Sequence, residues 1–210
     1  MKMIRAEISG TDLFSEKELA HGACCFYTED RKCKYIFAIS GRGATLYANT
    51  DQYIDQAIEE FLFYSGFITS IRDAKGNVIA ERTPSEPFLC DIKAIQPSQF
   101  YVNIEKLNRC KTWIKSQKDI IIPIIRKHDR IISLDGHTRL RAALDLGYAS
   151  AYVYLSPFDK TIFHFVDEAI RRGIYGVRDM ELVSGDEYKL KWDKFCDDLF
   201  ADLPSQGEHA

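Results

Sequence analysis

The sequence predicts an α+β protein built from three regions. Some segments repeat apolar residues at helical spacing, whereas others are short continuous apolar runs typical of strands. A chain of 210 residues with 46% hydrophobic residues can bury one large core or two small ones. A segment with two prolines at 84–87 separates the first part from the rest. We expect a small α+β N-terminal unit at 1–84, a central core at 85–156 and a helical extension at 157–210.

The N-terminal region combines strand and helix patterns. An apolar run stops at a short glycine turn at 41–43, whose spacing is not that of a P-loop or a dinucleotide fingerprint. Apolar residues three and four apart at 54–62 predict a helix, for which Asn49 or Thr50 can be the N-cap. The residues at 73–77 predict the turn of a β-hairpin.

The segment 131–141 is the most informative of the chain. Its apolar start stops at Asp135 and Gly136, helical spacing begins at once, and Gly147 ends the helix. A strand that turns directly into a helix presents backbone N–H groups that have no partner within the helix. Together with the helix dipole, these groups attract anions.

This turn predicts a binding site for a phosphorylated ligand. Glycine permits a close approach to the backbone, and arginine makes bidentate contacts with phosphate. A helix N-terminus alone contributes only about 0.3–1 kcal/mol, so side chains must supply most of the affinity. The residues expected to contact phosphate are Gly136, His137, Thr138, Arg139 and Arg141. In the alternative interpretation, Asp135 simply caps an ordinary core helix.

The segment from about 88 to 155 resembles the ParB/sulfiredoxin superfamily. Four features carry the resemblance: a strand at 92–99, a helix near 104–114, a Pro-Ile strand at 122–125 and the turn Gly136-His137-Thr138-Arg139. The Asp-Gly-His-x-Arg form of the turn is most similar to the free-serine kinases of the superfamily and to uncharacterised bacterial ParB-like proteins. The resemblance implies a ParB/sulfiredoxin-like core in which Gly136 and Arg139 occupy phosphate-contacting positions.

Departures from the superfamily limit the activity that the resemblance implies. Sulfiredoxin carries its catalytic cysteine directly after the turn glycine, where this chain has His137, so that activity is not expected. Partitioning ParB proteins have Glu-Arg-Arg at this place. The serine kinases place a catalytic glutamate after the first strand, where this chain has Pro97-Ser98-Gln99-Phe100. Nuclease activity is not expected either, because the core shows no cluster of carboxylates for metal ions.

The expected function is therefore binding of a nucleotide or another phosphorylated ligand at the turn Asp135–Arg139. If the protein is an enzyme, we expect an NTP-dependent phosphotransferase of a small molecule, with ATP/ADP or CTP and Mg²⁺ as cofactors. The candidate catalytic residues are His137, Asp135 and Glu105, and Asp135 is also the candidate Mg²⁺ ligand. The alternative is a non-catalytic, nucleotide-responsive regulator that acts on DNA or a protein partner.

The charge distribution favours an anionic ligand. The net charge is −3, yet the segment 93–141 holds eleven Lys or Arg residues against four Asp or Glu residues. The expected last helix is acidic, which opposes approach to DNA phosphates. Tight binding of duplex DNA by the protein alone is therefore not expected, and this helix is expected to serve packing or homodimer formation.

The composition also predicts the compartment. No stretch approaches the roughly 20 apolar residues that a membrane span needs, and the first residues lack the apolar core of a signal peptide. The six cysteines are irregularly spaced and are expected to be reduced thiols. We expect a cytoplasmic protein that does not cross a membrane.

Overall fold

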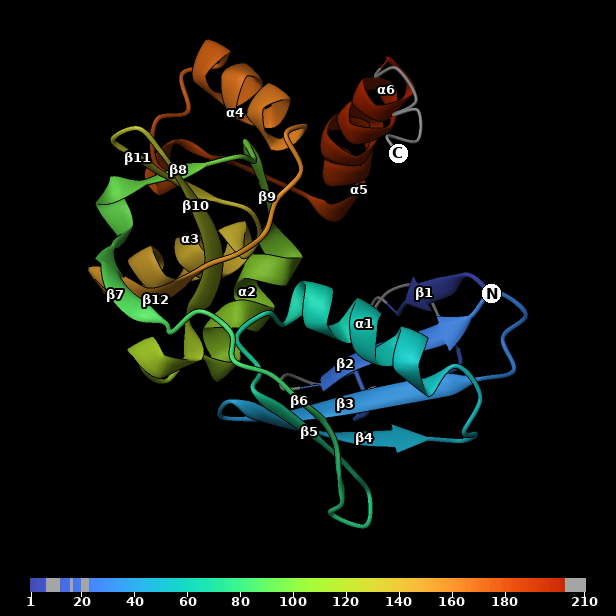
Figure 1. The fold of residues 1–210 in the computed structure, drawn as a ribbon. Coiled ribbons are helices and arrows are strands. Elements are labelled where there is room, and N and C mark those ends of the chain that lie inside the picture. Colours follow the sequence, from blue (N-terminus) through green and yellow to red (C-terminus); the bar gives the residue numbers. More distant parts are fainter. Residues whose placement is uncertain (7–11, 16, 20–22, 203–210) are drawn as a thin grey trace, which may run out of the picture. The chain divides into compact units, whose positions relative to one another are not determined.

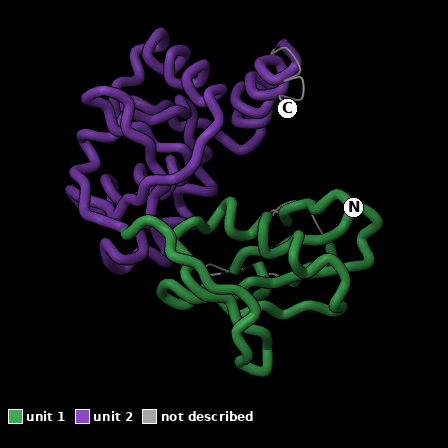
Figure 2. The backbone as a smooth tube through the Cα atoms, in the orientation of Figure 1, with its two compact units in different colours: residues 1–86 green, residues 87–210 purple. Residues whose placement is uncertain are grey.

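The structure is a computed structural model that describes residues 1–6, 12–15, 17–19 and 23–202. It has an α+β fold that divides into two compact units, Met1–Glu86 and Pro87–Ala210 (Figure 2). The division falls inside the segment with two prolines. The C-terminal helices belong to the same unit as the central core.

The first unit is a six-stranded sheet with one helix packed on it (Figure 1). The strands lie side by side in chain order. Neighbouring strands are antiparallel except β4 and β5, which are parallel and are connected by the helix. The helix packs through Phe61, whose ring stacks on Phe37 at a centroid distance of 4.1 Å. The elements are β1 (Met3–Arg5), β2 (Ala23–Thr28), β3 (Lys34–Ser40), β4 (Gly43–Ala48), α1 (Ile54–Tyr64), β5 (Ser70–Asp73) and β6 (Val78–Glu81).

The helix α1 and the hairpin β5–β6 are confirmed, but the expected N-cap of α1 is wrong. The residue at the N-cap is Tyr53, in a left-handed conformation with φ 54°. The side chain of Asn49 instead accepts from Lys34 N–H, and Thr50 Oγ1 accepts from Gln52 N–H. Both polar side chains are therefore used in the loop before the helix begins.

The second unit contains a five-stranded sheet in the order β7-β12-β10-β11-β8 and a separate parallel pair, β9 and β13. The strand β10 runs parallel to β12, β11 runs parallel to β8, and β10 and β11 form an antiparallel hairpin. The elements are β7 (Phe88–Asp91), β8 (Ile95–Pro97), β9 (Tyr101–Asn103), α2 (Ile104–Trp113), β10 (Ile121–Lys127), β11 (Arg130–Ser133), α3 (His137–Asp145), β12 (Ser150–Leu155), α4 (Ile162–Arg171), β13 (Glu181–Val183), α5 (Gly185–Tyr188) and α6 (Lys194–Asp202).

The strand expected at 92–99 is only partly correct. The residues Ile92–Ala94 form a 3₁₀ turn, and only the three residues of β8 that follow are extended. The Asp91 side chain causes the break, because it accepts a hydrogen bond from Lys93 N–H and caps the turn.

Two apolar layers sandwich this sheet. Leu107 of α2 and Leu140 of α3 lie in one cluster with Ile122, whereas Val166 of α4 packs with Ile125 and Ile132 on the other face. Successive side chains of a strand point to opposite faces. Ser133, one residue after Ile132, therefore points toward the layer that contains α2 and α3.

The described part of the C-terminal segment is largely helical, as expected, but it also contains the strand β13, which pairs with β9. The Ser184 and Glu187 side chains form a capping box at the start of α5. A π-helical segment, Lys189–Asp193, joins α5 to α6. Among the described residues, no helix is both long and apolar enough to span a membrane. The six cysteines, all of which are described, are free thiols.

Candidate functional site

The predicted strand–turn–helix is confirmed at residues 130–145. The strand β11 ends at Ser133, and α3 begins at His137 with Gly136 at the N-cap position. The first bond within the helix runs from Leu140 N–H to Gly136 C=O, at 2.9 Å. The N–H groups of residues 137–139 therefore have no carbonyl acceptor within the helix.

Gly136 is required by the packing of the turn. Its φ of +77° lies in the left-handed region, which side chains disfavour. A Cβ at this position would lie 2.6 Å from Ile122 Cδ1 and 3.1 Å from Arg139 Nη2. The sequence predicts that this glycine permits close approach of a ligand, whereas in the structure the protein's own β10 and Arg139 occupy that side of Gly136.

Arg139 folds back over the turn. Its Nη1 donates to Ile121 C=O at 2.8 Å, and its Nη2 contacts Asp135 Oδ2 at 3.4 Å. These two contacts use two of the five N–H donors of a guanidinium group. The side chain is 27% exposed. The positive charge therefore lies at the N-terminus of α3, where solvent can still reach it.

His137 is buried and acts as a hydrogen-bond acceptor. The residue is 5% exposed, and its Nε2 accepts from Ser98 N–H at 3.2 Å. Burial lowers the pKa of His137 to about 4, although the nearby Asp135 charge and a hydrogen bond with the Ser133 backbone favour protonation. The ring is therefore neutral near pH 7, and the Nε2 atom that meets Ser98 carries no proton.

Ser98 and Ser133 complete a buried polar cluster that no sequence pattern predicted. Ser98 Oγ donates to Ser133 C=O at 2.8 Å and lies 3.1 Å from His137 Nε2. Ser133 is fully buried, and within the described part of the chain its Oγ has no hydrogen-bond partner. A buried hydroxyl without a partner costs about 1–3 kcal/mol. No local pattern predicts the contact between Ser98 and His137, because it joins residues 39 positions apart.

The pair of Ser98 and His137 does not have the geometry of a nucleophile and its base. A general base must accept the proton of the attacking hydroxyl. Here that proton points to the Ser133 carbonyl, and the histidine lone pair already accepts from a backbone N–H. The cluster instead fixes the end of β8 to the start of α3.

Of the other expected site residues, Thr138 follows His137 in the first turn of α3 and is half-buried. Arg141 points away from this turn: it donates to Met180 C=O at 2.9 Å and to Asp145 at 3.2 Å. Glu105 is exposed on α2, and a Cβ on Gly185 would lie 3.4 Å from its Oε2. The structure thus places Glu105 beside the start of α5.

Asp135 is the expected Mg²⁺ ligand and the carboxylate that precedes the turn glycine. Its side chain is 59% exposed and pairs with Arg139. In the described residues, no group of three or more His, Cys, Asp or Glu side chains is arranged to hold a metal ion. Asp135 alone fits a Mg²⁺ ion only if phosphate oxygens supply further ligands, which is a common arrangement for this ion.

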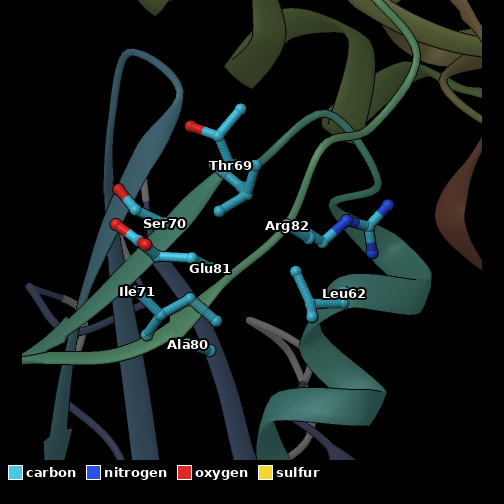
Figure 3. A pocket seen from close by; sticks show the side chains of 8 residues that line it. Leu62, Thr69, Ser70, Ile71, Ala80, Glu81 and Arg82 are labelled. Carbon is cyan, nitrogen blue, oxygen red and sulfur yellow. The ribbon is translucent and has the colours of Figure 1, made fainter.

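The first unit contains a pocket that has no room for a ligand (Figure 3). It lies between α1 and the strands β5 and β6, and its volume is about 20 Å³. This space holds roughly one water molecule. The pocket is lined by Leu62, Ile68, Thr69, Ser70, Ile71, Ala80, Glu81 and Arg82.

No protein-family model and no curated protein matches the chain. One similar solved structure is the crystal structure of protein Atu1540 from Agrobacterium tumefaciens, with a TM-score of 0.38 and 13% sequence identity. The match covers 57% of this chain and 82% of that chain.

Proposed function

We propose that the turn Asp135–Arg139 binds the phosphate group of a nucleotide or another phosphorylated small molecule. The observation that carries the proposal is the position of Arg139, whose guanidinium lies over the N-cap glycine of α3. The positive charge and the first-turn N–H groups of the helix therefore meet at one place. The buried Ser133 hydroxyl, which points toward the layer that contains α3, is a further polar group beside this turn.

The strengths of these interactions are sufficient for a weak to moderate site. Millimolar affinity requires about 4 kcal/mol. Charge-assisted hydrogen bonds from Arg139 contribute about 1.5–3 kcal/mol each, and the helix N-terminus adds about 0.3–1 kcal/mol. The resemblance of the turn to the ParB/sulfiredoxin superfamily supports the same assignment. ATP, ADP and CTP, with and without Mg²⁺, are the first ligands to test.

Phosphoryl transfer at this turn would require a general base other than His137. His137 is buried, neutral and engaged with Ser98, so it is poorly suited to accept a proton from a substrate. Asp135 and Glu105 are the carboxylates that would remain for that role. We therefore propose that free-serine phosphorylation is absent or very slow.

A thermal unfolding screen tests the binding site. Both tryptophans of the chain, Trp113 and Trp192, lie in the second unit, so their emission follows the unit that contains the turn. A ligand at 100 times its Kd stabilises the folded state by about 2.7 kcal/mol. At least one nucleotide should raise the melting temperature, and Arg139→Ala should abolish this shift while the unit remains folded.

The matched control is Arg130→Ala. Arg130 is exposed at the hairpin end of β11, so this variant loses the same charge away from the turn and should keep the ligand response. If no phosphorylated compound stabilises the wild-type protein at millimolar concentration, the turn is not a phosphate site. The regulator alternative gains support if the protein binds duplex DNA at submicromolar concentration in physiological salt.

A further inference from the structure

Three consecutive residues connect the proposed anion site to the C-terminal helix. Ser98 meets the turn, because its N–H donates to His137 Nε2 at 3.2 Å. Gln99 meets α5, because its Nε2 donates to Tyr188 Oη at 3.1 Å. Both contacts are made by adjacent residues of the short loop between β8 and β9.

Phe100, the next residue of this loop, meets the rest of the C-terminal helix. Its ring lies edge-on to Trp192 and to Phe195, with a centroid distance of 4.9 Å to each. Phe100 is 1% exposed, and the Arg172 guanidinium lies 4.3 Å from its ring centroid. The loop is thus held tightly on both sides, so a displacement at one end disturbs the packing at the other.

Among the described residues, the C-terminal helix packs on the core along one side. Trp192 and Phe195 are half-buried against the core, whereas Leu190 is 72% and Phe200 57% exposed. In the described part of α6, no residue is fully buried. Elements with few buried apolar contacts open at a lower free energy than the core does. This helix is therefore expected to open at a lower free energy than the core of the unit does.

We infer that residues 98–100 couple anion binding at the Gly136 turn to the docking of the C-terminal helix, residues 185–202. This inference rests on the proposed function and assigns its regulation. An anion that draws on the first-turn N–H groups of α3 acts on His137, the first residue of that helix. The His137 ring passes the change to Ser98, and Phe100 passes it to Trp192 and Phe195. The coupling is reciprocal, because each event must change the free energy of the other equally.

A single-tryptophan protein tests the coupling. In the variant Trp113→Phe, Trp192 is the only tryptophan and reports the docking of the helix. Inorganic pyrophosphate and ATP are titrated as probes. Trp192 emission should change with the same midpoint as the rise in melting temperature. Tyr188→Phe, which removes the hydroxyl that accepts from Gln99, should weaken this response; Tyr175→Phe, on an exposed tyrosine outside the loop contacts, is the control.

A second experiment tests the coupling without a ligand. Phe195→Ala removes a ring from Phe100 without touching the turn. The Ser98 amide should then exchange its hydrogen at least about fivefold faster, which is the lower end of typical coupling between sites. The same variant should change the Kd for pyrophosphate by a similar factor.

The outcomes separate the two proposals. If pyrophosphate or ATP raises the melting temperature while Trp192 emission stays constant, the anion site stands and the coupling is overturned. An unchanged Ser98 exchange rate in Phe195→Ala overturns the coupling as well. If no phosphorylated compound raises the melting temperature, the proposed function fails and the coupling falls with it.

Discussion

Two glycine turns in this protein look similar in sequence and differ in what they can do. Each has a glycine with positive φ, Gly41 at +59° and Gly136 at +77°, and an arginine close behind it. Gly41 joins β3 to β4, so the chain continues as a strand whose N–H groups pair within the sheet. Gly136 opens α3, so the N–H groups after it have no acceptor within the helix.

The two arginines differ in the same way. Arg42 lies in a surface ion pair with Glu86 and donates to Phe67 C=O, so its role is to tie parts of the first unit together. Arg139 lies over the start of a helix, where its charge adds to the dipole. A glycine beside an arginine is therefore a weak predictor of a phosphate site, and the element that follows the turn decides the function.

The largest expected difference between the turns concerns the glycines themselves. Gly136→Ala combines a left-handed conformation, at about 1–2 kcal/mol, with a clash against Ile122, at about 1–3 kcal/mol. It should lower the free energy of unfolding of the second unit by about 2–5 kcal/mol. Gly41→Ala meets no atom within 4 Å and should cost only about 1–2 kcal/mol.

Denaturant unfolding measures both variants. Tryptophan emission follows the second unit alone, whereas circular dichroism follows both units. Gly136→Ala should shift the tryptophan transition, and Gly41→Ala should leave it in place. Equal losses in the two variants would show that the packing around Gly136 is not as tight as the structure indicates.

The second prediction concerns pH and His137. The folded protein binds the His137 proton only near pH 4, whereas the unfolded chain binds it near pH 6.5. The stability that comes from the neutral ring is therefore complete above pH 6.5 and is lost as the pH falls toward 4. Between pH 7 and pH 5, the second unit should lose about 2 kcal/mol.

The control for this prediction is His137→Asn, which keeps a hydrogen-bond acceptor but does not titrate. Its free energy of unfolding should be lower at pH 7 and should vary less between pH 7 and pH 5. Anion binding by the wild type should show no step near pH 6.5 that arises from His137. A strong rise in binding as the pH falls through 6.5 would support a protonated, phosphate-contacting histidine instead.

The third prediction tests the role of Arg42. Arg42→Ala leaves Glu86 without its partner and should lower the stability of the first unit by about 1 kcal/mol, because the Glu86 carboxylate is largely exposed and its ion pair is weak. The ligand-induced rise in the tryptophan-monitored melting temperature should be unchanged. A loss of the ligand response in this variant would place the anion site in the first unit and refute the distinction between the two turns.

The smallest expected effect on stability comes from Asp135→Asn. The ion pair with Arg139 spans four positions of an exposed turn and contributes at most about 0.5 kcal/mol. The variant should bind pyrophosphate more tightly in the absence of Mg²⁺, because a negative charge no longer competes for Arg139. Isothermal titration with and without Mg²⁺ checks this; weaker binding only with Mg²⁺ would assign Asp135 as a metal ligand.

Much of the secondary structure was predictable from the sequence, for local reasons. Helical spacing identified α1 and α3, whereas α2 was implied by the family resemblance. These features depend on hydrogen bonds and side-chain contacts between residues three or four positions apart. The strand–turn–helix at Gly136 was predictable for the same local reason.

The roles of the site residues were less predictable. Arg141 matched the predicted phosphate site by its position in the sequence, yet carbonyls near Met180 hold it in the structure. His137 was a candidate proton carrier, yet burial makes it a neutral acceptor. In both residues, the deciding partners lie 39 positions away in the chain.

The sequence by itself determined the α+β class, the positions of several helices and strands, and the basic turn at the start of α3. Only the tertiary structure decided which side chains of that turn face solvent and which are buried. It also brought Ser98, Gln99 and Phe100 between the turn and the C-terminal helix. The physical reason is that periodicity and capping act within a few residues, whereas burial depends on which distant segments pack together.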